Sequence, residues 1–259
     1  MSPWLRSFNP RPGTSVRLVC FPHAGGGPSS FRPWDALLPD SVELLAACYP
    51  GREDRFAEPA APGLAEMGQD LAEALLPLLD RPWIAFGHSM GTIVAYETVR
   101  QLQHLGAPVP LSLHVSGRRS PDRGLGGTVH SAGEEGLKAE LERLGGTPKE
   151  VLEDEMLRSA ILGTVREDYR LVETYRPVAD ARVGCPVRVL GGRQDPELNG
   201  PSEDGAFGWS RFTTAAVTTR MLPGDHFYLV PHRREVVADV LSVLDPALVG
   251  ASRTWPDTP

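Results

Sequence analysis

Residues 85–97 read AFGHSMGTIVAYE and place a serine between two glycines, where an apolar run gives way to a helical pattern. The segment GHSMG at 87–91 fits the G-x-S-x-G pattern, in which a sharp turn from strand to helix holds the serine in a strained conformation. The glycines leave room for the closely packed strand and helix. Ser89 is therefore predicted to be a nucleophile on such a turn.

The sequence on both sides of Ser89 supports this interpretation. Pro82–Phe86 (PWIAF) is a short apolar run typical of a buried parallel strand, and Thr92–Gln103 repeats apolar residues at helical spacing. The alternative is a turn of small residues with an idle serine, because the pattern alone is short enough to occur by chance.

Length, composition and charge narrow the class of protein. The 259 residues are 41% hydrophobic, which suffices for a single α/β domain spanning residues 1–259. A formal net charge of −7 and a pI near 5.5 argue against a nucleic-acid partner. No run approaches the ~18 apolar residues that span a bilayer, and the N-terminus lacks the apolar core of a secretory signal. We expect a cytoplasmic enzyme with no membrane partner.

Three cysteines, Cys20, Cys48 and Cys185, are widely spaced and form no zinc-binding pattern with the histidines. We expect them to be reduced, with Cys20 and Cys48 acting as small apolar residues inside strands. No metal site is predicted.

Six strand-like runs alternate with helical patterns along the chain. They are Val16–Phe21, Val42–Tyr49, Pro82–Phe86, Leu111–Val115, Val187–Leu190 and Ala216–Leu222. Apolar residues at steps of three and four mark amphipathic helices over 64–78 and 236–244. This alternation predicts the α/β class, with a mostly parallel central sheet flanked by helices on both faces.

The segment between the fourth and fifth of these runs is too long for one crossover helix. Ser131–Glu134 and Thr147–Glu150 both match the S/T-x-x-E capping box, and a third helical pattern follows over 157–175. We predict that residues 124–175 form a helical lid insertion over the catalytic edge of the sheet. The alternative is extra helices that pack on the core and gate nothing.

A serine hydroxyl is a weak nucleophile until an adjacent base removes its proton, so Ser89 needs a histidine and a carboxylate that orients it. With this type of turn the expected chain order is serine, acid, histidine. His130 and His232 also follow Ser89, but His130 precedes the late strands and His232 begins the last helix. His226 comes directly after the last strand-like run and is the predicted base.

The acid is expected in a loop that follows an earlier strand. Asp195 lies in LGGRQDP at 190–196, directly after a strand-like run, and is the predicted acid. Asp122, after the preceding strand, is the alternative. Asp225 is too close to His226 in sequence to orient its far ring nitrogen.

An oxyanion needs backbone donors, and the amide that follows the nucleophile, that of Met90, is the first. FPHAGGG at 21–27 resembles an HGGG-type loop after an early strand, so the second predicted donor is the amide of Ala24. A glycine-rich loop could instead bind phosphate, but the sequence contains neither G-x-G-x-x-G nor a lysine-bearing P-loop.

Six motifs follow one another along the chain: FPHAGG (21–26), YPGRE (49–53), FGHSMG (86–91), SGRR (116–119), GGRQDP (191–196) and PGDHF (223–227). Together, in this order, they resemble the type II thioesterases of polyketide and nonribosomal peptide biosynthesis. The resemblance runs from about Arg17 to Leu244 and implies an α/β-hydrolase fold with Ser89, Asp195 and His226 as catalytic triad.

The same resemblance implies an activity. Enzymes of this family remove acyl or aminoacyl groups from the phosphopantetheine arms of acyl or peptidyl carrier proteins, which clears mis-primed or stalled units of a synthase. No metal or other cofactor is expected, because phosphopantetheine arrives on the carrier protein and the serine supplies the nucleophile.

Two positions depart from the family pattern: Thr92, where alanine is frequent, and Asp225, where glycine is frequent. Neither change removes a catalytic group. We hypothesise that a carboxylate at Asp225 favours protonated His226 and moves the alkaline limb of the pH–rate profile upward.

Arg118, Arg119 and Arg123 follow a strand at the same sheet edge as Ser89. Carrier proteins tend to be acidic, as this chain is, so a local basic patch has to guide the encounter. We expect these arginines to contact the carrier protein or its phosphate, the alternative being structural or solvated ion pairs.

Three other functions are consistent with parts of the sequence. A carboxylesterase or lipase would use the same triad. A chain-terminating thioesterase domain would normally end a larger polypeptide, whereas Met1 here lies just before the first strand-like run. Some proteins of this fold are binding modules without turnover, which the intact set of Ser89, Asp195 and His226 argues against.

Overall fold

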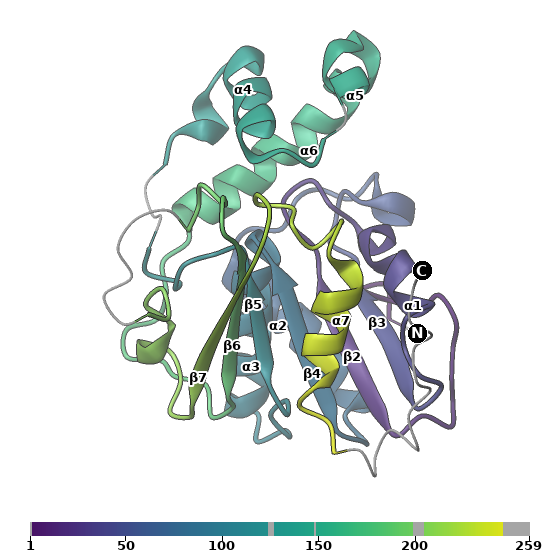
Figure 1. The fold of residues 1–259 in the computed structure, drawn as a ribbon. Helices are drawn as coiled ribbons and strands as arrows, with labels where there is room; N and C mark the ends of the chain where they lie inside the picture. Colours follow the sequence, from purple (N-terminus) through teal and green to yellow (C-terminus); the bar gives the residue numbers. More distant parts are fainter. Residues whose placement is uncertain (1, 124–126, 148, 199–204, 246–259) are drawn as a thin grey trace, which may run out of the picture.

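The computed structural model describes residues 2–123, 127–147, 149–198 and 205–245. Within them lies a seven-stranded sheet with the order β1-β3-β2-β4-β5-β6-β7 (Figure 1). Its strands are β1 (Leu5–Arg6), β2 (Val16–Phe21), β3 (Val42–Ala47), β4 (Trp83–His88), β5 (Leu113–Ser116), β6 (Val187–Gly192) and β7 (Val217–Leu222). The short β1 pairs antiparallel with β3, and the other neighbours pair in parallel.

The predicted α/β class and the mostly parallel sheet are confirmed. Each of the six strand-like runs corresponds to one strand from β2 to β7. These runs were recognisable because β2, β3, β4 and β5 are buried along their whole length, so both faces of each strand are apolar. The strand β1 was not predicted, since two residues carry no periodic signal.

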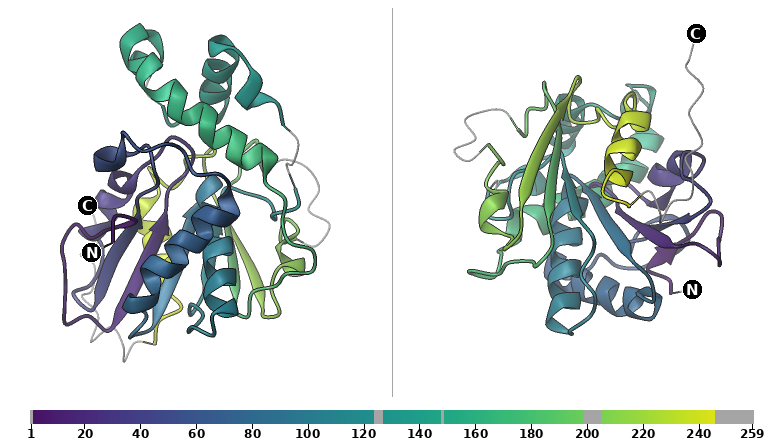
Figure 2. Two further views of the ribbon diagram at one scale, coloured as in Figure 1. Left: turned by 180° about the vertical axis from the view of Figure 1, so that it is seen from behind. Right: turned by 60° about the horizontal axis from the view of Figure 1, so that its bottom comes forward.

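Helices cover both faces of the sheet. Helices α2 (Leu64–Leu75) and α3 (Met90–His104) lie on one face, and α1 (Arg32–Asp35) and α7 (Arg233–Leu241) lie on the other (Figures 1 and 2). Short 3₁₀ helices connect the larger elements: η1 (Pro28–Phe31), η2 (Glu53–Arg55), η3 (Leu76–Leu78), η4 (Val129–Ser131) and η5 (Trp209–Arg211).

The two faces of the sheet carry separate apolar cores. Along β2, Val19 and Phe21 pack with the residues of α2 and α3, whereas Leu18 and Cys20 pack with those of α1 and α7. This alternation follows from the two-residue period of a strand. Both cores hold the sheet rigid, and the loops at the carboxyl ends of the strands are positioned on that support.

Three helices lie between β5 and β6 and stand together beyond the carboxyl ends of the strands (Figure 1). They are α4 (Glu134–Leu144), α5 (Lys149–Glu153) and α6 (Glu155–Thr174). Leu137, Leu141, Leu152, Leu162 and Val165 form a small apolar core among them. These helices agree with the helical pattern of the predicted insertion 124–175, although residues 124–126 lie outside the described residues.

One capping prediction for these helices is wrong. Ser131 belongs to η4, where its hydroxyl donates to the carbonyl of Thr128 at 2.9 Å, and α4 begins after Gly133 without a side-chain cap. The serine bonds to its own turn instead of the helix, which is the usual competition for short hydroxyl side chains. The second predicted box includes Pro148, which lies outside the described residues.

The cysteines Cys20, Cys48 and Cys185 are free and buried. Burial raises the pKa of each thiol, for Cys185 to about 12, so all three are neutral apolar groups at pH 7. Across the described part of the chain, no helix is both long and apolar enough to cross a membrane.

Candidate active site

Ser89 lies on the turn between β4 and α3, with φ 53° and ψ −119°. Few residues other than glycine adopt a positive φ, so this backbone is strained as the motif predicted. Both flanking positions require glycine because a side chain would collide with the backbone. A Cβ on Gly87 would lie 2.3 Å from the Gly91 carbonyl oxygen, and one on Gly91 would lie 2.0 Å from the Phe21 carbonyl oxygen. The strain at Ser89 is therefore enforced by the packing of β2, β4 and α3.

Thr92, one of the departures from the family pattern, supports the same turn. Its buried hydroxyl donates to the carbonyl oxygens of Gly87 at 3.1 Å and Ser116 at 3.2 Å. The Ser89 amide also donates to the Ser116 carbonyl, at 2.8 Å. The threonine thus ties the nucleophile turn to the end of β5.

His226 and Asp195 meet at the same edge of the sheet. His226 follows β7 and Asp195 follows β6, and the His226 Nδ1 lies 3.0 Å from each carboxylate oxygen of Asp195. Both side chains are buried, and the Glu197 amide also donates to Asp195 Oδ1 at 2.9 Å. The carboxylate fixes the tautomer with hydrogen on Nδ1, which leaves the Nε2 lone pair free to accept a proton. His226 Nε2 is buried and has no hydrogen-bond partner among the described residues.

Two further histidines pack beside His226. The ring of His88 lies 4.9 Å from that of His226, and the ring of His23 lies 5.8 Å from that of His88. His88 Nδ1 is held by the Ser116 hydroxyl at 3.0 Å, which in turn lies 2.7 Å from the Tyr228 hydroxyl. Sequence reasoning assigned these two histidines no role, although both stand in the quoted motifs.

The electrostatic consequence of this cluster is that His23 and His88 stay uncharged. Burial, with a smaller contribution from His226, lowers the pKa of His23 to about 4 and that of His88 well below its ordinary value. Both rings are therefore neutral at pH 7. They therefore add no positive charge near His226 that would oppose its protonation.

The residues that carry the two predicted oxyanion donors come from two different segments of the chain. Ala24, after β2, and Met90, at the start of α3, both line the same cavity as Ser89. Neither amide has an acceptor within the described residues. Both residues of the predicted oxyanion donors therefore belong to the lining of the cavity that Ser89 also lines.

A buried ion pair holds the loop that carries Ala24. Asp168 on α6 accepts a hydrogen bond from the Gly25 amide at 2.6 Å and pairs with Arg52. Arg52 also donates to the Gly26 carbonyl at 3.2 Å and to the Pro50 carbonyl at 2.9 Å. Burial raises the pKa of Asp168, although the Arg52 charge lowers it. Helix α6 is thus linked directly to this loop, residues 22–27, which is the predicted oxyanion loop.

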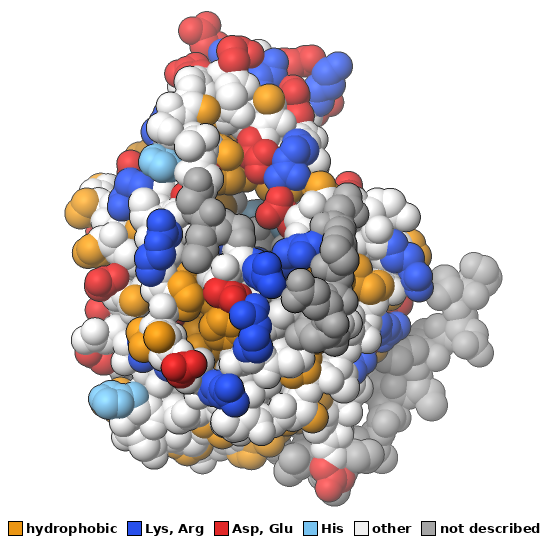
Figure 3. Space-filling view, turned by 90° about the vertical axis from the view of Figure 1, so that its left-hand side faces the viewer, with side chains coloured by type: hydrophobic (Ala, Val, Ile, Leu, Met, Phe, Trp, Pro, Cys, Tyr) orange, Lys and Arg blue, Asp and Glu red, His pale blue; other side chains and the backbone are white. Residues whose placement is uncertain are grey.

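The cavity has a volume of about 250 Å³ and lies between the sheet edge and the α4–α6 helices. Figure 3 shows the molecular surface hollowed below these helices. Its apolar wall comes mainly from α4 and α6: Leu141, Leu144, Ile161, Val165 and Val172. Its polar lining includes His23, Arg118, Glu140, Thr147, Tyr169 and Glu197, with Ser89 and His226 at the sheet edge.

Comparison with known proteins shows the family of this chain. The family model described as "Thioesterase domain" matches residues 16–244. The chain belongs to the thioesterase family. It is a hydrolase that acts on thioesters, and the resemblance found in its motifs is confirmed.

Relatives and solved structures agree with this assignment. The thioesterase is 40% identical to the probable cadicidin biosynthesis thioesterase of Streptomyces griseus, over 94% of this chain and 66% of that relative. It is 39% identical to thioesterase PikA5 of Streptomyces venezuelae, over 92% of this chain and 84% of the relative. The crystallographic neighbour BorB, a type II thioesterase from the borrelidin biosynthetic cluster, superposes with a TM-score of 0.84 at 37% identity, covering 93% and 98% of the two chains. The predicted α/β-hydrolase fold is the fold of such enzymes.

The other titratable candidates of the thioesterase are engaged elsewhere. Asp122, the alternative acid, accepts from the Ser120 hydroxyl at 2.6 Å and pairs with Arg211 at 2.8 Å. His130 is bound to Glu173 in the helical insertion, and His232 lies 3.2 Å from Glu235 on α7. Of the described candidates, Asp195 and His226 are the acid and histidine that the fold brings together.

Asp225, the second departure from the family pattern, makes no direct contact with His226 that would show a role there. It is exposed, and its Oδ1 accepts a hydrogen bond from the Phe227 amide at 2.9 Å. No bond joins it to His226 among the described residues. Its effect on the pH–rate profile stays a prediction.

The three arginines predicted to contact a carrier protein lie in different surroundings. Arg118 lines the active-site cavity of the thioesterase. Arg119 is half-buried and donates to the Glu197 carbonyl at 3.2 Å, and Arg123 is exposed. Arg123 is therefore the one with a side chain placed for an encounter at the outer surface.

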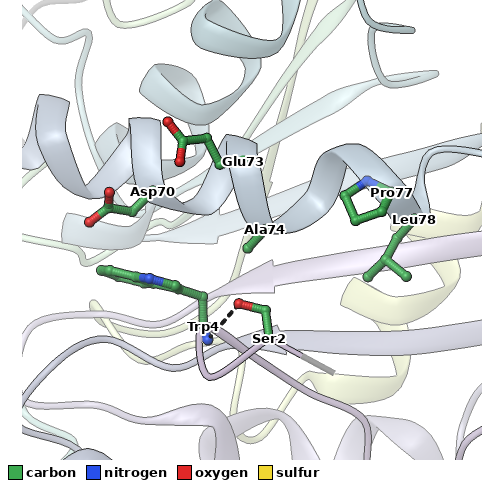
Figure 4. A pocket seen from close by; sticks show the side chains of 7 residues that line it. All are labelled: Ser2, Trp4, Asp70, Glu73, Ala74, Pro77 and Leu78. Atoms are coloured by element: carbon green, nitrogen blue, oxygen red, sulfur yellow. Dashed lines mark hydrogen bonds between the residues drawn. The ribbon is translucent and has the colours of Figure 1, made fainter.

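A second hollow lies between the N-terminal segment and helix α2 with η3. It has a volume of about 420 Å³ and is lined by Ser2, Trp4, Asp70, Glu73, Ala74, Pro77 and Leu78 (Figure 4). It contains none of the predicted catalytic residues. Among the described residues, no three His, Cys, Asp or Glu side chains are placed to hold a metal ion.

Proposed function

We propose that this thioesterase hydrolyses acyl or aminoacyl groups from the phosphopantetheine arms of carrier proteins, with Ser89, His226 and Asp195 as its triad. The observation that carries the proposal is the His226–Asp195 contact of 3.0 Å beside a cavity that Ser89 also lines. The strained turn at Ser89 adds support, since such strain is characteristic of this nucleophile.

In the first step, His226 Nε2 accepts the Ser89 hydroxyl proton as the serine oxygen attacks the thioester carbonyl. Asp195 stabilises the imidazolium that forms, and the amides of Ala24 and Met90 bind the oxyanion. The carbon–sulfur bond then breaks. The phosphopantetheine thiol leaves with the proton from His226, and the acyl group stays on Ser89.

In the second step, His226 removes a proton from water as the water oxygen attacks the carbonyl of the acyl-serine ester. The second oxyanion that forms is bound by the same two amides. Collapse returns the proton to Ser89 and releases the carboxylic acid. The neutral rings of His23 and His88 matter in both steps, because a neighbouring imidazolium would lower the basicity of His226. The mechanism requires no cofactor besides the phosphopantetheine that the substrate brings.

The substrate carrier is inferred from the relatives. BorB belongs to the borrelidin cluster, and the structural neighbour YbtT is a type II thioesterase of the yersiniabactin NRPS/PKS pathway, with a TM-score of 0.81 at 27% identity. We therefore assign to this chain the clearing of mis-primed or stalled carriers of a polyketide or nonribosomal peptide synthase. Such partners place the reaction in the cytoplasm.

The α4–α6 helices fit the role of a lid in this scheme. They supply the apolar wall of the cavity, and α6 contributes Asp168 to the oxyanion loop. Access to the cavity and assembly of the oxyanion hole would therefore depend on the same helix.

The test is hydrolysis of acyl-loaded carrier proteins beside matched oxygen esters, with native protein, Ser89→Ala and the exposed control Ser210→Ala. We expect faster cleavage of carrier-bound thioesters, lost in Ser89→Ala and retained in Ser210→Ala. Preference for oxygen esters would indicate a general esterase or lipase. Turnover that is independent of Ser89, or none at all, would refute the proposed triad.

A further inference from the structure

Arg118 is a basic side chain that lines the cavity and has no part in the proposed mechanism. It follows Gly117, whose φ of +65° turns the chain beside the rings of His88 and His226. The Arg118 carbonyl accepts a hydrogen bond from the Trp209 indole at 3.1 Å, which fixes the loop. The side chain is partly buried and lines the same cavity as Ser89.

The guanidinium of Arg118 has no partner in the described protein. Its Nε is buried without a hydrogen bond, and no ion pair joins the side chain to a described carboxylate. Burial lowers its pKa, and the charge of Glu197 is the largest opposing influence. Buried donors in native proteins are nearly always satisfied, so an unpaired arginine in a substrate cavity indicates an acceptor on the substrate.

The nearby carboxylates are already bound to other groups. Arg143 donates to Glu140 at 2.7 Å and to Glu197 at 2.6 Å, and the Tyr169 hydroxyl donates to Glu140 at 3.1 Å. These bonds pair both glutamates with Arg143, and no ion pair is formed between either of them and Arg118 among the described residues. A substrate carboxylate entering the cavity would meet two like charges, whereas an uncharged oxygen would not.

We infer that Arg118 donates a hydrogen bond to an uncharged carbonyl oxygen of the thioester substrate, other than the carbonyl under attack. The inference rests on the proposed function and adds a specificity-determining contact to it. Two parts of the substrate present such an oxygen: a keto group in the acyl chain, or an amide of the phosphopantetheine arm. Both are neutral acceptors that suit a guanidinium donor.

The experiment compares pairs of small thioesters that differ in one carbonyl-bearing group: a keto group in the acyl chain or an amide in the thiol. In the acyl arm, 3-oxobutyryl and butyryl thioesters of N-acetylcysteamine are hydrolysed by native protein, Arg118→Met and Arg118→Lys. In the thiol arm, the butyryl thioester of N-acetylcysteamine is compared with that of propanethiol. The exposed Arg234→Met removes the same charge at a distant site and serves as control.

The expected result is a change of selectivity in one arm. Arg118→Met should lower the ratio of kcat/KM between the carbonyl-bearing and the plain thioester about tenfold or more, with a smaller loss in Arg118→Lys. A drop in the acyl arm assigns the contact to the acyl chain, and a drop in the thiol arm assigns it to the pantetheine amide. Arg234→Met should keep the native ratios.

Two results would overturn the inference in distinguishable ways. Selectivity ratios that are equal in native protein and Arg118→Met, in both arms, would show that Arg118 donates to neither carbonyl while the proposed function stands. Failure of the native protein to cleave any of these thioesters in a Ser89-dependent reaction would refute the proposed function, and this contact with it.

Discussion

The link between α6 and the oxyanion loop leads to a measurable prediction for Asp168→Ala. In the native protein, Asp168 Oδ2 accepts from the Gly25 amide at 2.6 Å and pairs with Arg52, and both charged side chains are buried. The substitution removes both contacts at once. It leaves the Arg52 charge in the interior and releases the loop that positions the Ala24 amide.

Stability and rate should both fall, for different reasons. Removing one partner of a buried ion pair typically costs about 3–5 kcal/mol in the free energy of unfolding, because the remaining charge is desolvated and unpaired. Losing one oxyanion donor costs roughly 10²–10³ in kcat, so a displaced Ala24 amide should lower kcat by up to about 10²-fold. KM should change little, since the interaction is made mainly in the transition state.

Asp168→Asn is the matched control, because its amide oxygen can still accept from Gly25 while the charge is lost. It should lose stability but retain most of the native kcat. The assays are urea unfolding at pH 7 and steady-state hydrolysis of an N-acetylcysteamine thioester at a temperature where every variant is folded. A native kcat in Asp168→Ala, with only stability reduced, would refute the positioning of the oxyanion loop by this pair.

Three smaller predictions concern other sites. Burial lowers the pKa of His114 to about 3, below its unfolded value near 6.5, so its contribution to stability is present above that value and is lost as the pH falls. Between pH 7 and pH 5, the free energy of unfolding of His114→Leu, measured in urea, should therefore fall by about 2 kcal/mol less than that of the native protein. An equal fall in both proteins would contradict this. Thr92→Val, which removes the hydroxyl bonds to Gly87 and Ser116, should lower the free energy of unfolding by about 1 kcal/mol, and equal stability would show that these bonds add nothing. Arg123→Glu should raise KM for carrier-bound substrate at least about threefold relative to a small thioester at low salt, and a constant ratio would argue against docking there.

The sequence predicted the sheet and the acid–histidine pair for the same physical reason. Strands buried on both faces read as apolar runs, and parallel strands bring the residues that follow them to one edge. Asp195 follows the mostly buried β6 and His226 follows β7, so the parallel order predicted that both lie at one edge of the sheet, where His226 Nδ1 is 3.0 Å from the Asp195 carboxylate. The strained turn at Ser89 was predictable because its glycines have a steric cause.

Contacts between distant loops and helices were not predictable in this way. Arg52 and Asp168 are separated by 116 positions, and neither stands in a periodic pattern that relates it to the other. Arg52 was visible as part of the motif at 49–53, but a motif gives no partner. The capping box at Ser131 failed for a related reason, since the serine had a closer acceptor in its own turn.

The direction of a side chain was also beyond the sequence. Three arginines follow β5, and the strand pattern placed all of them near the catalytic edge. Gly117 then turns the chain so that Arg118 enters the cavity, while Arg123 stays exposed. Neighbouring residues of one type therefore lie in different surroundings, one in the cavity and the other at the outer surface.

Helix α6 connects the apolar wall of the cavity to the oxyanion loop. It lines the cavity through Ile161, Val165 and Val172, and it holds the oxyanion loop through Asp168. An acyl group that displaces the apolar wall would strain the same helix that sets the oxyanion donors. Poorly fitting acyl groups should then be rejected through a lower kcat as well as a higher KM, which couples the size of the acyl group to the chemistry.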